Sequence, residues 1–408
     1  MANRFDIFLV RFIICEFILR SGMIDYNEFV RLASMLSKFM CHGICMNPQR
    51  EPDQSNDRAQ SCGHVNGSLA TIDFGPTNDG GLDGHFSMLS RHNGGGPNVC
   101  SEFWVDWFLA WGSKKNNLNI GTVIDDLNHM YYVNNASVNI YMIHGGTNFG
   151  FMNGPNIITS YDYGAPISEN GNITDLYVAI SSWIKNNITG WPQPPLAIPA
   201  NPPVTNYGQV TLKRVGTNLL STLSQIQEPC TQSQDPLTFV QVDHGYGFVL
   251  YTTTLKAGGK TLVAPNIRDY GYVFINGNYQ GLFNVTLDGA ALQTWFQCGI
   301  NLTEASVNSL TSSFVTENEE VLPEKAASQP GVFVGTFSAN TLTDTFFNST
   351  GWGKGQLFVN GFNVGRYWPI TLYVPGPIIK ANNTVVLIEL IGAQQNYVNF
   401  IDHTIYNY

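Results

Sequence analysis

The sequence has little charge of either sign, and what charge it has is mainly acidic. Only 12% of its 408 residues are charged, which is about half the usual share for soluble domains. The formal net charge is −10. Because a nucleic-acid-binding protein needs a basic face, this composition argues against nucleic acid as a partner. A neutral ligand such as a sugar fits the few charges and the 12% of aromatic residues better.

Cysteine is scarce, and its spacing does not suit a metal centre. Cys41 and Cys45 are close together, but no second pair completes a zinc site. We therefore expect no metal and no cofactor. The seven cysteines leave at least one thiol that is either free or paired between chains, so a homo-oligomer is left open.

Long hydrophobic runs are absent. No stretch approaches the roughly 20 apolar residues of a membrane span. Residues 7–10 and 12–15 are apolar, but Arg11 separates them, and no clear signal peptide results. In contrast, eight Asn-x-Ser/Thr sequons are present, which favours a secretory route. They begin at Asn66, Asn135, Asn172, Asn187, Asn284, Asn301, Asn348 and Asn382.

The apolar pattern changes along the chain and predicts two kinds of architecture. Short apolar runs at residues 69–74, 99–103 and 137–143, with helical spacing over 121–134, indicate βα units and a parallel sheet. A proline-rich connector follows from Trp191. Beyond it, strand-like runs succeed one another without helices. The predicted fold class is therefore α/β plus all-β.

Two Asn-Gly pairs each follow a strand-like run. Asn276-Gly277 and Asn360-Gly361 are both strong hairpin signals. They suggest two related β-modules.

Glu102 is the strongest candidate for a catalytic residue. It ends an apolar strand and is followed by Phe103, Trp104 and Trp107. In α/β barrels, side chains at the C-terminal ends of strands face the active site. A carboxylate among aromatic faces suits sugar chemistry. The alternative is a solvated glutamate that caps the following helix.

Three blocks of sequence around and after Glu102 resemble glycoside hydrolase family 35 β-galactosidases of the animal lysosomal acid type. The blocks occur in the family's order and spacing. The first contains Ser101-Glu102-Phe103 with Trp107 and Trp111-Gly112. The second is residues 139–150, around His144-Gly145-Gly146-Thr147-Asn148, and the third is residues 159–169, around Tyr161-Asp162-Tyr163. Residues 351–369 are similar to the galactose-binding-like jelly roll of these enzymes. The resemblance covers most of residues 60–408.

The resemblance implies a retaining β-galactosidase that hydrolyses terminal non-reducing β-D-galactose from glycoconjugates. Glu102 would be the nucleophile, Tyr163 would hydrogen-bond the sugar or steady Glu102, and Trp104 and Trp107 would wall the pocket. For Trp111 we prefer packing in the core. The glycines of Gly145-Gly146 would shape a turn and take no part in catalysis.

The sequence departs from the family at the second carboxyl group. A retaining glycosidase needs an acid/base about 5–5.5 Å from the nucleophile, and the family's Asn-Glu-Tyr/Phe-Gly turn is missing. Glu16 falls near that position, without the preceding Asn or the following Gly. The alternatives are a degraded N-terminal region, and a galactoside-binding homologue or truncated product that lacks the acid/base.

Length gives the same indication. A (β/α)8 barrel takes about 200–250 residues, and about 190 precede the connector, so we expect an incomplete TIM-type barrel followed by β-sandwich or jelly-roll domains. The expected division is 1–190 for the partial catalytic domain (with 1–60 poorly matched), 191–234 for the connector, 235–312 for a shortened first β-domain and 313–408 for the galactose-binding-like domain. By family and sequons, we expect a lysosomal, vacuolar or secreted location.

Overall fold

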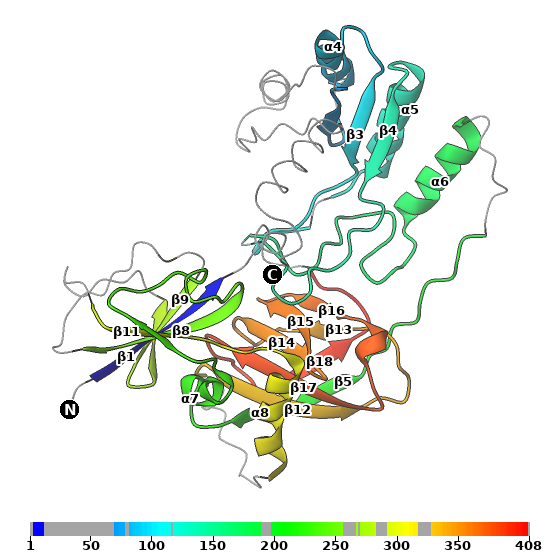
Figure 1. Cartoon of the computed structure of the whole chain (residues 1–408). Coiled ribbons are helices and arrows are strands. Elements are labelled where there is room, and N and C mark those ends of the chain that lie inside the picture. The colour runs from blue at the N-terminus through cyan, green and yellow to red at the C-terminus, as the bar shows by residue number, and fades with distance from the viewer. Residues whose placement is uncertain are drawn as a thin grey trace.

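The structure is a computed structural model, and it describes ten stretches of the chain (Figure 1). They are residues 3–11, 69–77, 81–115, 117–154, 156–188, 197–255, 267, 270–282, 292–316 and 328–406. Their helices and strands form one small parallel sheet with helices and three antiparallel sheets. The predicted class, α/β plus all-β, is confirmed at this level.

The parallel sheet has the order β2-β3-β4 and is flanked by helices (Figure 1). Its strands are β2 (Ile72–Phe74), β3 (Val99–Trp104) and β4 (Ser137–Tyr141), and its helices are α4 (Leu82–Asn93), α5 (Ile120–Tyr132) and α6 (Asp175–Asn187). One hydrophobic cluster joins these elements and includes Phe103, Leu127 and Trp183. The alternation of strand and helix predicted βα units, and the parallel pairing confirms them.

Capping residues set where the helices begin. The side chain of Asn119 accepts a hydrogen bond from the Thr122 amide at the start of α5, and Thr174 does the same for Tyr177 in α6. The Trp183 indole then donates to Asn128 at 2.8 Å, which ties α6 to α5.

A six-stranded antiparallel sheet has the order β10-β9-β1-β8-β11-β7. Its strands are β1 (Asn3–Arg11), β7 (Thr231–Ser233), β8 (Gly247–Leu255), β9 (Tyr270–Ile275), β10 (Asn278–Leu282) and β11 (Trp295–Gly299). A disulfide joins Cys230 to Cys298 beside this sheet.

Strand β1 differs from the sequence expectation. The sequence places residues 1–190 in the barrel domain, yet β1 lies between β8 and β9 and pairs with β8 over its whole length and with β9 from Phe5 to Val10. A strand's partners are set by pairing across the sheet, which its own short apolar run does not encode.

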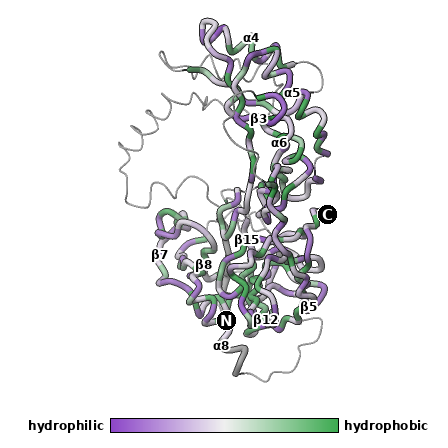
Figure 2. The backbone as a smooth tube through the Cα atoms, turned by 90° about the vertical axis from the view of Figure 1, so that its right-hand side faces the viewer, coloured by the Kyte–Doolittle hydropathy of each residue, from purple (hydrophilic) through white to green (hydrophobic). Residues whose placement is uncertain are grey.

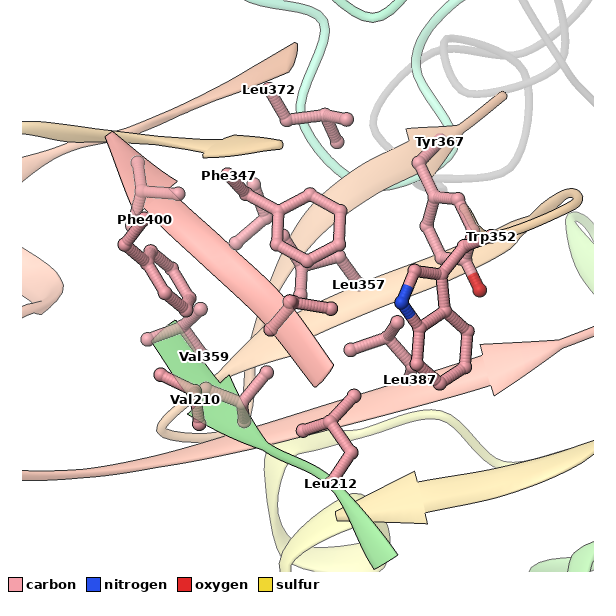
Figure 3. Packing of buried hydrophobic residues seen from close by; sticks show 14 of the residues in the cluster. Val210, Leu212, Phe347, Trp352, Leu357, Val359, Tyr367, Leu372, Leu387 and Phe400 are labelled. Carbon is pink, nitrogen blue, oxygen red and sulfur yellow. The ribbon is translucent and has the colours of Figure 1, made fainter. Parts of the chain in front are cut away.

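Two further sheets make a sandwich. The five-stranded sheet has the order β15-β14-β17-β12-β6 and the four-stranded sheet the order β16-β13-β18-β5. The strands are β5 (Gly208–Thr211), β6 (Lys213–Val215), β12 (Gly331–Ser338), β13 (Thr345–Asn348), β14 (Gly355–Val359), β15 (Phe362–Tyr367), β16 (Thr371–Val374), β17 (Asn382–Glu389) and β18 (Tyr397–Ile401). Side chains from both sheets, including Leu357, Leu387 and Phe400, fill the space between them (Figure 3).

The five-stranded sheet is buried on both faces. In β17, Val385 and Leu387 belong to the cluster shared with the four-stranded sheet. Val386 and Ile388 belong to a second cluster, which contains Phe248 and Leu250 of β8 and residues of the helices α7 (Leu219–Leu223), α8 (Glu304–Thr316) and η1 (Ser224–Ile226). Because successive strand residues point to opposite faces, such a strand reads as a continuous apolar run. A short turn, η3 (Gly376–Ile378), precedes β17.

The expected connector contains strands of its own. Residues 191–234 were assigned to a proline-rich linker, but β5 pairs with β18 and β6 pairs with β12. Their partners lie more than 100 residues away in sequence, which is why the local pattern did not identify them. The domain limits as a whole stay a prediction.

Both predicted hairpins are confirmed. Asn276 and Gly277 join β9 to β10 with φ values of 52° and 79°, and Asn360 and Gly361 join β14 to β15 with 53° and 81°. Positive φ at both central residues is the geometry that favours Asn-Gly.

Loops beyond the parallel sheet contact the sandwich. Arg366 donates through Nη2 to the Gly154 carbonyl at 3.0 Å, and Gln356 donates to the Gly150 carbonyl at 3.0 Å. The rings of Trp111 and Trp368 lie 5.9 Å apart. Figure 2, turned by 90°, shows β3 and helices α4, α5 and α6 at one end of the molecule and the antiparallel sheets at the other. Within the described stretches, no helix has the length and apolar character to cross a bilayer.

Candidate functional site

The candidate site lies at the C-terminal ends of the parallel strands. These ends carry Asp73 on β2, Glu102 and Trp104 on β3, and Tyr141 on β4. Asp73 pairs in register with Glu102, and Trp104 with Tyr141. In sheets of this kind, ligands bind at the carboxyl ends of the strands.

Glu102 is held by a neighbour on its own strand. The indole Nε1–H of Trp104 donates to Oε2 of Glu102 at 3.0 Å. Residues two apart on a strand point to the same face, and this places the indole beside the carboxylate. Trp104 therefore does more than the sequence predicted, because it is a hydrogen-bond donor to Glu102.

Aromatic rings surround this pair. The Trp107 ring lies 4.9 Å from that of Trp104 at an interplanar angle of 69°, and 5.9 Å from that of Tyr163. Tyr161 stacks on Tyr163 at 5.4 Å. Trp107 is 41% exposed, so an apolar ring face borders solvent next to Glu102. The structure thus brings Trp104, Trp107 and Tyr163 together beside Glu102. The sequence predicted these three residues as the substrate-binding side chains.

Tyr163 is buried and has an unused hydroxyl group. It is 2% exposed, and its hydroxyl has no hydrogen-bond partner among the described residues. Burial raises the pKa of Tyr163, and the nearby Tyr161, Tyr141 and Glu102 raise it further. The hydroxyl therefore keeps its proton and can donate a hydrogen bond to a ligand oxygen or a carboxylate.

The Gly145-Gly146 turn follows β4 and packs against the same cluster. A Cβ atom at Gly145 would overlap the carbonyl oxygen of Tyr161. Gly146 has a φ of +83°, and its carbonyl accepts from the Tyr161 amide at 2.9 Å. The expectation that these glycines serve the backbone conformation agrees with this geometry.

Glu169 is a buried carboxyl that sequence reasoning did not single out. Thr147 Oγ1 donates to its Oε1 at 2.7 Å. Burial raises the pKa of Glu169 to about 8. Glu169 also lines a cavity of about 660 Å³ between the loops of the parallel sheet and the end of the sandwich, with Asp106, Asp162 and Tyr406. Its place in a polar stretch gave no signal of burial.

Other residues were also missed. Asp73 ends the apolar run 69–74 in the same way that Glu102 ends its own run, and this was the available signal. Among the described residues, no three His, Cys, Asp or Glu side chains gather as a metal site. Glu16, the predicted acid/base candidate, lies outside the described residues.

A carboxylate at the end of a parallel strand, beside tryptophan and tyrosine rings, is an arrangement found in glycoside hydrolases as a class. Residues 24–187 match the model "Glycosyl hydrolases family 35". Residues 236–303 match "Beta-galactosidase, first all-beta domain", and residues 330–384 match "Beta-galactosidase, galactose-binding domain". The family 35 model thus matches the first of these ranges and β-galactosidase domain models match the other two, which confirms the resemblance found in the sequence.

Curated relatives agree with this assignment. The chain is 32% identical to a beta-galactosidase of Felis catus, over 83% of this chain and 60% of the relative. It is 33% identical to a beta-galactosidase of Bos taurus, over 83% and 61%. It is 33% identical to a beta-galactosidase-1-like protein of Mus musculus, over 85% and 62%. The chain thus spans about three fifths of the length of these relatives.

Proposed function

We propose that the chain is a retaining β-galactosidase that hydrolyses terminal non-reducing β-D-galactose. The observation that carries this proposal is Glu102 at the end of β3, hydrogen-bonded by Trp104 at 3.0 Å and bordered by Trp107 and Tyr163. A carboxylate attacks the anomeric carbon, and an aromatic face packs against the apolar face of a pyranose. The parallel sheet would be a section of a (β/α)8 barrel.

In this mechanism Glu102 forms a covalent galactosyl-enzyme, which water then hydrolyses with net retention. The Tyr163 hydroxyl would donate to a sugar oxygen or to Glu102, because burial keeps it protonated. Glu16 is the candidate for the acid that protonates the leaving group.

The test compares the wild-type protein with Glu102→Gln on an aryl β-galactoside. We expect the substitution to lower kcat by at least about 10³-fold, because the amide does not form the covalent intermediate. Glu228→Gln is the matched control. It makes the same chemical change in a side chain that pairs with His244 outside the candidate site. Equal rates for wild type and Glu102→Gln would contradict the proposed role.

A glycine at position 102 gives a second readout. Azide entering the space left by the Glu102→Gly change should attack from the same side as the lost carboxylate and yield α-galactosyl azide. If the wild-type enzyme is active but the Glu102→Gly variant forms no α-galactosyl azide, another residue is the nucleophile.

The alternative is a galactoside-binding protein without turnover. The match of residues 330–384 to a galactose-binding domain favours it. Calorimetric titration with galactose separates the two, since binding with no hydrolysis of an aryl galactoside supports the alternative.

We further propose a β-galactoside glycan, glycolipid or oligosaccharide as the partner, and a lysosomal, vacuolar or secreted location. The Cys230–Cys298 disulfide supports an oxidising compartment. A homo-oligomer and the absence of nucleic-acid binding stay predictions.

A further inference from the structure

Strand β3 carries an extra residue immediately before the proposed nucleophile. Cys100 and Phe103 of β3 pair with Val138 and Ile140 of β4, so the two residues between them face Asn139 alone. An extra residue of this kind is a β-bulge, which bends the strand and changes the direction of nearby side chains. Bulges are rare in parallel pairs.

The register with β2 identifies the extra residue. Cys100 pairs with Ile72, and Glu102 pairs with Asp73, so Ser101 has no residue opposite it. The bulge therefore centres on Ser101, and Glu102 is the first residue after it.

Side chains from both neighbouring strands hold this bulge. On the β4 side, Nδ2 of Asn139 donates to the carbonyl of Ser101 at 2.8 Å. On the β2 side, Oγ of Ser101 lies 2.6 Å from Oδ1 of Asp73 and 2.7 Å from Oγ1 of Thr71. The backbone carbonyl and the side chain of one bulged residue are thus fixed from opposite directions.

The bulge decides where the Glu102 side chain points. Without the extra residue, the strictly alternating pleat would move residue 102 to the other face of the sheet. With it, Oε2 of Glu102 accepts from the Trp104 indole at 3.0 Å, and Trp104 itself packs edge-on against Trp107. The bulge and the indole together fix the carboxylate.

We propose that Asn139, Ser101 and Asp73 are positioning residues that hold the β3 bulge and thereby aim Glu102 at the anomeric carbon. The proposal rests on the proposed function, since it takes Glu102 as the nucleophile. Asn139 and Asp73 act through the backbone and the side chain of Ser101, and they do not touch the sugar.

The experiment isolates the attack of Glu102. The probe is 2,4-dinitrophenyl 2-deoxy-2-fluoro-β-D-galactoside, whose leaving group departs without an acid and whose fluorine slows breakdown of the galactosyl-enzyme. Intact-protein mass spectrometry follows the adduct, and it yields a rate constant at saturation and a concentration for half-saturation.

The variant is Asn139→Ala, and the matched control is Asn98→Ala. Asn98 precedes the other end of β3 and makes the same kind of bond, from Nδ2 to the Asn134 carbonyl at 2.8 Å. Because Asn139 is exposed, alanine there leaves no cavity. We expect Asn139→Ala to lower the saturating rate constant by about 10- to 100-fold, since small misplacements of a reacting group cost that much. The half-saturation concentration and the control variant should change little.

Ser101→Ala provides an independent variant, because it removes the bond to Asp73 and keeps the bond from Asn139. We expect a smaller loss in the saturating rate. If both variants react at the wild-type rate, the positioning role is wrong. If Asn98→Ala loses as much rate as Asn139→Ala, the effect is general destabilisation and the proposal also fails.

A crystal structure of Asn139→Ala separates this proposal from the proposed function. A displaced Glu102 carboxylate supports the positioning role even if the wild-type protein forms no adduct, in which case the proposed function alone fails. An unmoved carboxylate with the bulge intact overturns the positioning role whatever the kinetics.

Discussion

At the scale of single residues, Glu169 is a buried carboxyl group whose environment strongly alters its acidity. It is 5% exposed, accepts from Thr147 at 2.7 Å, and lies near the Asp162 carboxylate and the buried Tyr406. Burial opposes ionisation, so the pKa rises from 4.5 to about 8. The folded protein therefore holds a proton that the unfolded chain releases between these values.

This difference predicts that stability falls as the pH rises. Below pH 4.5 Glu169 is protonated in both states, and its contribution is fully present. Between pH 4.5 and about 8 the unfolded chain ionises first, and the free energy of unfolding falls by up to about 1.4 kcal/mol per pH unit. Denaturant melts from pH 5 to 9 should show this slope, and Glu169→Gln should reduce it. An unchanged slope would mean that Glu169 titrates normally.

Substitution of Tyr163 should affect galactose affinity and the free energy of unfolding differently. Its hydroxyl is buried without a partner in the described part of the chain, so Tyr163→Phe removes a polar group that gains nothing from folding. We expect the free energy of unfolding to stay constant or to rise by about 1 kcal/mol. Galactose affinity should fall by about 10-fold if the hydroxyl donates to the sugar. Thermal melts and calorimetry measure both, and a large loss of stability would show that the hydroxyl has a structural partner.

At the scale of elements, the two Asn-Gly hairpins make a matched pair. Gly361 and Gly277 have nearly equal φ values, 81° and 79°. A Cβ at Gly361 would come within 2.5 Å of Glu304 Cγ, whereas a Cβ at Gly277 would meet the Asn218 side chain only at 3.4 Å. Alanine would therefore meet the same backbone strain at both positions, but it would clash with a neighbouring side chain only at Gly361.

We expect Gly277→Ala to destabilise the protein by about 1 kcal/mol, the cost of a left-handed conformation for a residue with a Cβ. Gly361→Ala should cost about 1–3 kcal/mol more, because the β14–β15 turn and α8 must separate. Chemical denaturation of both variants gives the difference. Equal losses would show that Glu304 moves aside freely.

Elements whose partners are near in sequence were predictable, and those with distant partners were not. The apolar run 99–103 gave strand β3 almost to its last residue, and the helical spacing over 121–134 gave α5 (Ile120–Tyr132). In contrast, β1 and β5 depend on pairing with strands more than 150 residues away. The Ser101 bulge was also hidden, because it is defined only by the registers of β2 and β4.

The same limit applied to the candidate site. Glu102 stood out because it ends an apolar strand among aromatic residues, and the family resemblance then gave roles to Trp104, Trp107 and Tyr163, all of which stay predictions. The Trp104–Glu102 hydrogen bond and the burial of Glu169 depend on side-chain directions in the folded chain, which no local pattern carries.

At the scale of the whole molecule, three antiparallel sheets are joined by shared hydrophobic clusters, and a disulfide closes a long loop at the edge of one of them. The disulfide joins Cys230, just before β7, to Cys298 on β11 over a separation of 68 residues. It restrains the edge of the six-stranded sheet, where β7 makes only a three-residue pairing with β11. Within the described residues, Cys100 is a free thiol, and it is buried on β3.

This arrangement predicts how much of the stability depends on an oxidising environment. Replacing both cysteines by serine should lower the free energy of unfolding by about 4 kcal/mol, because a loop of this length no longer restricts the unfolded chain. Serine also leaves a polar group at Cys298, which is 4% exposed, so a Cys230→Ala/Cys298→Ala variant separates that cost. Adding a reductant to the wild-type protein should lower its stability towards that of the alanine variant, and the same reductant added to the alanine variant controls for the other five cysteines. If reduction leaves the transition where it was, the disulfide adds nothing to the stability of the sheets.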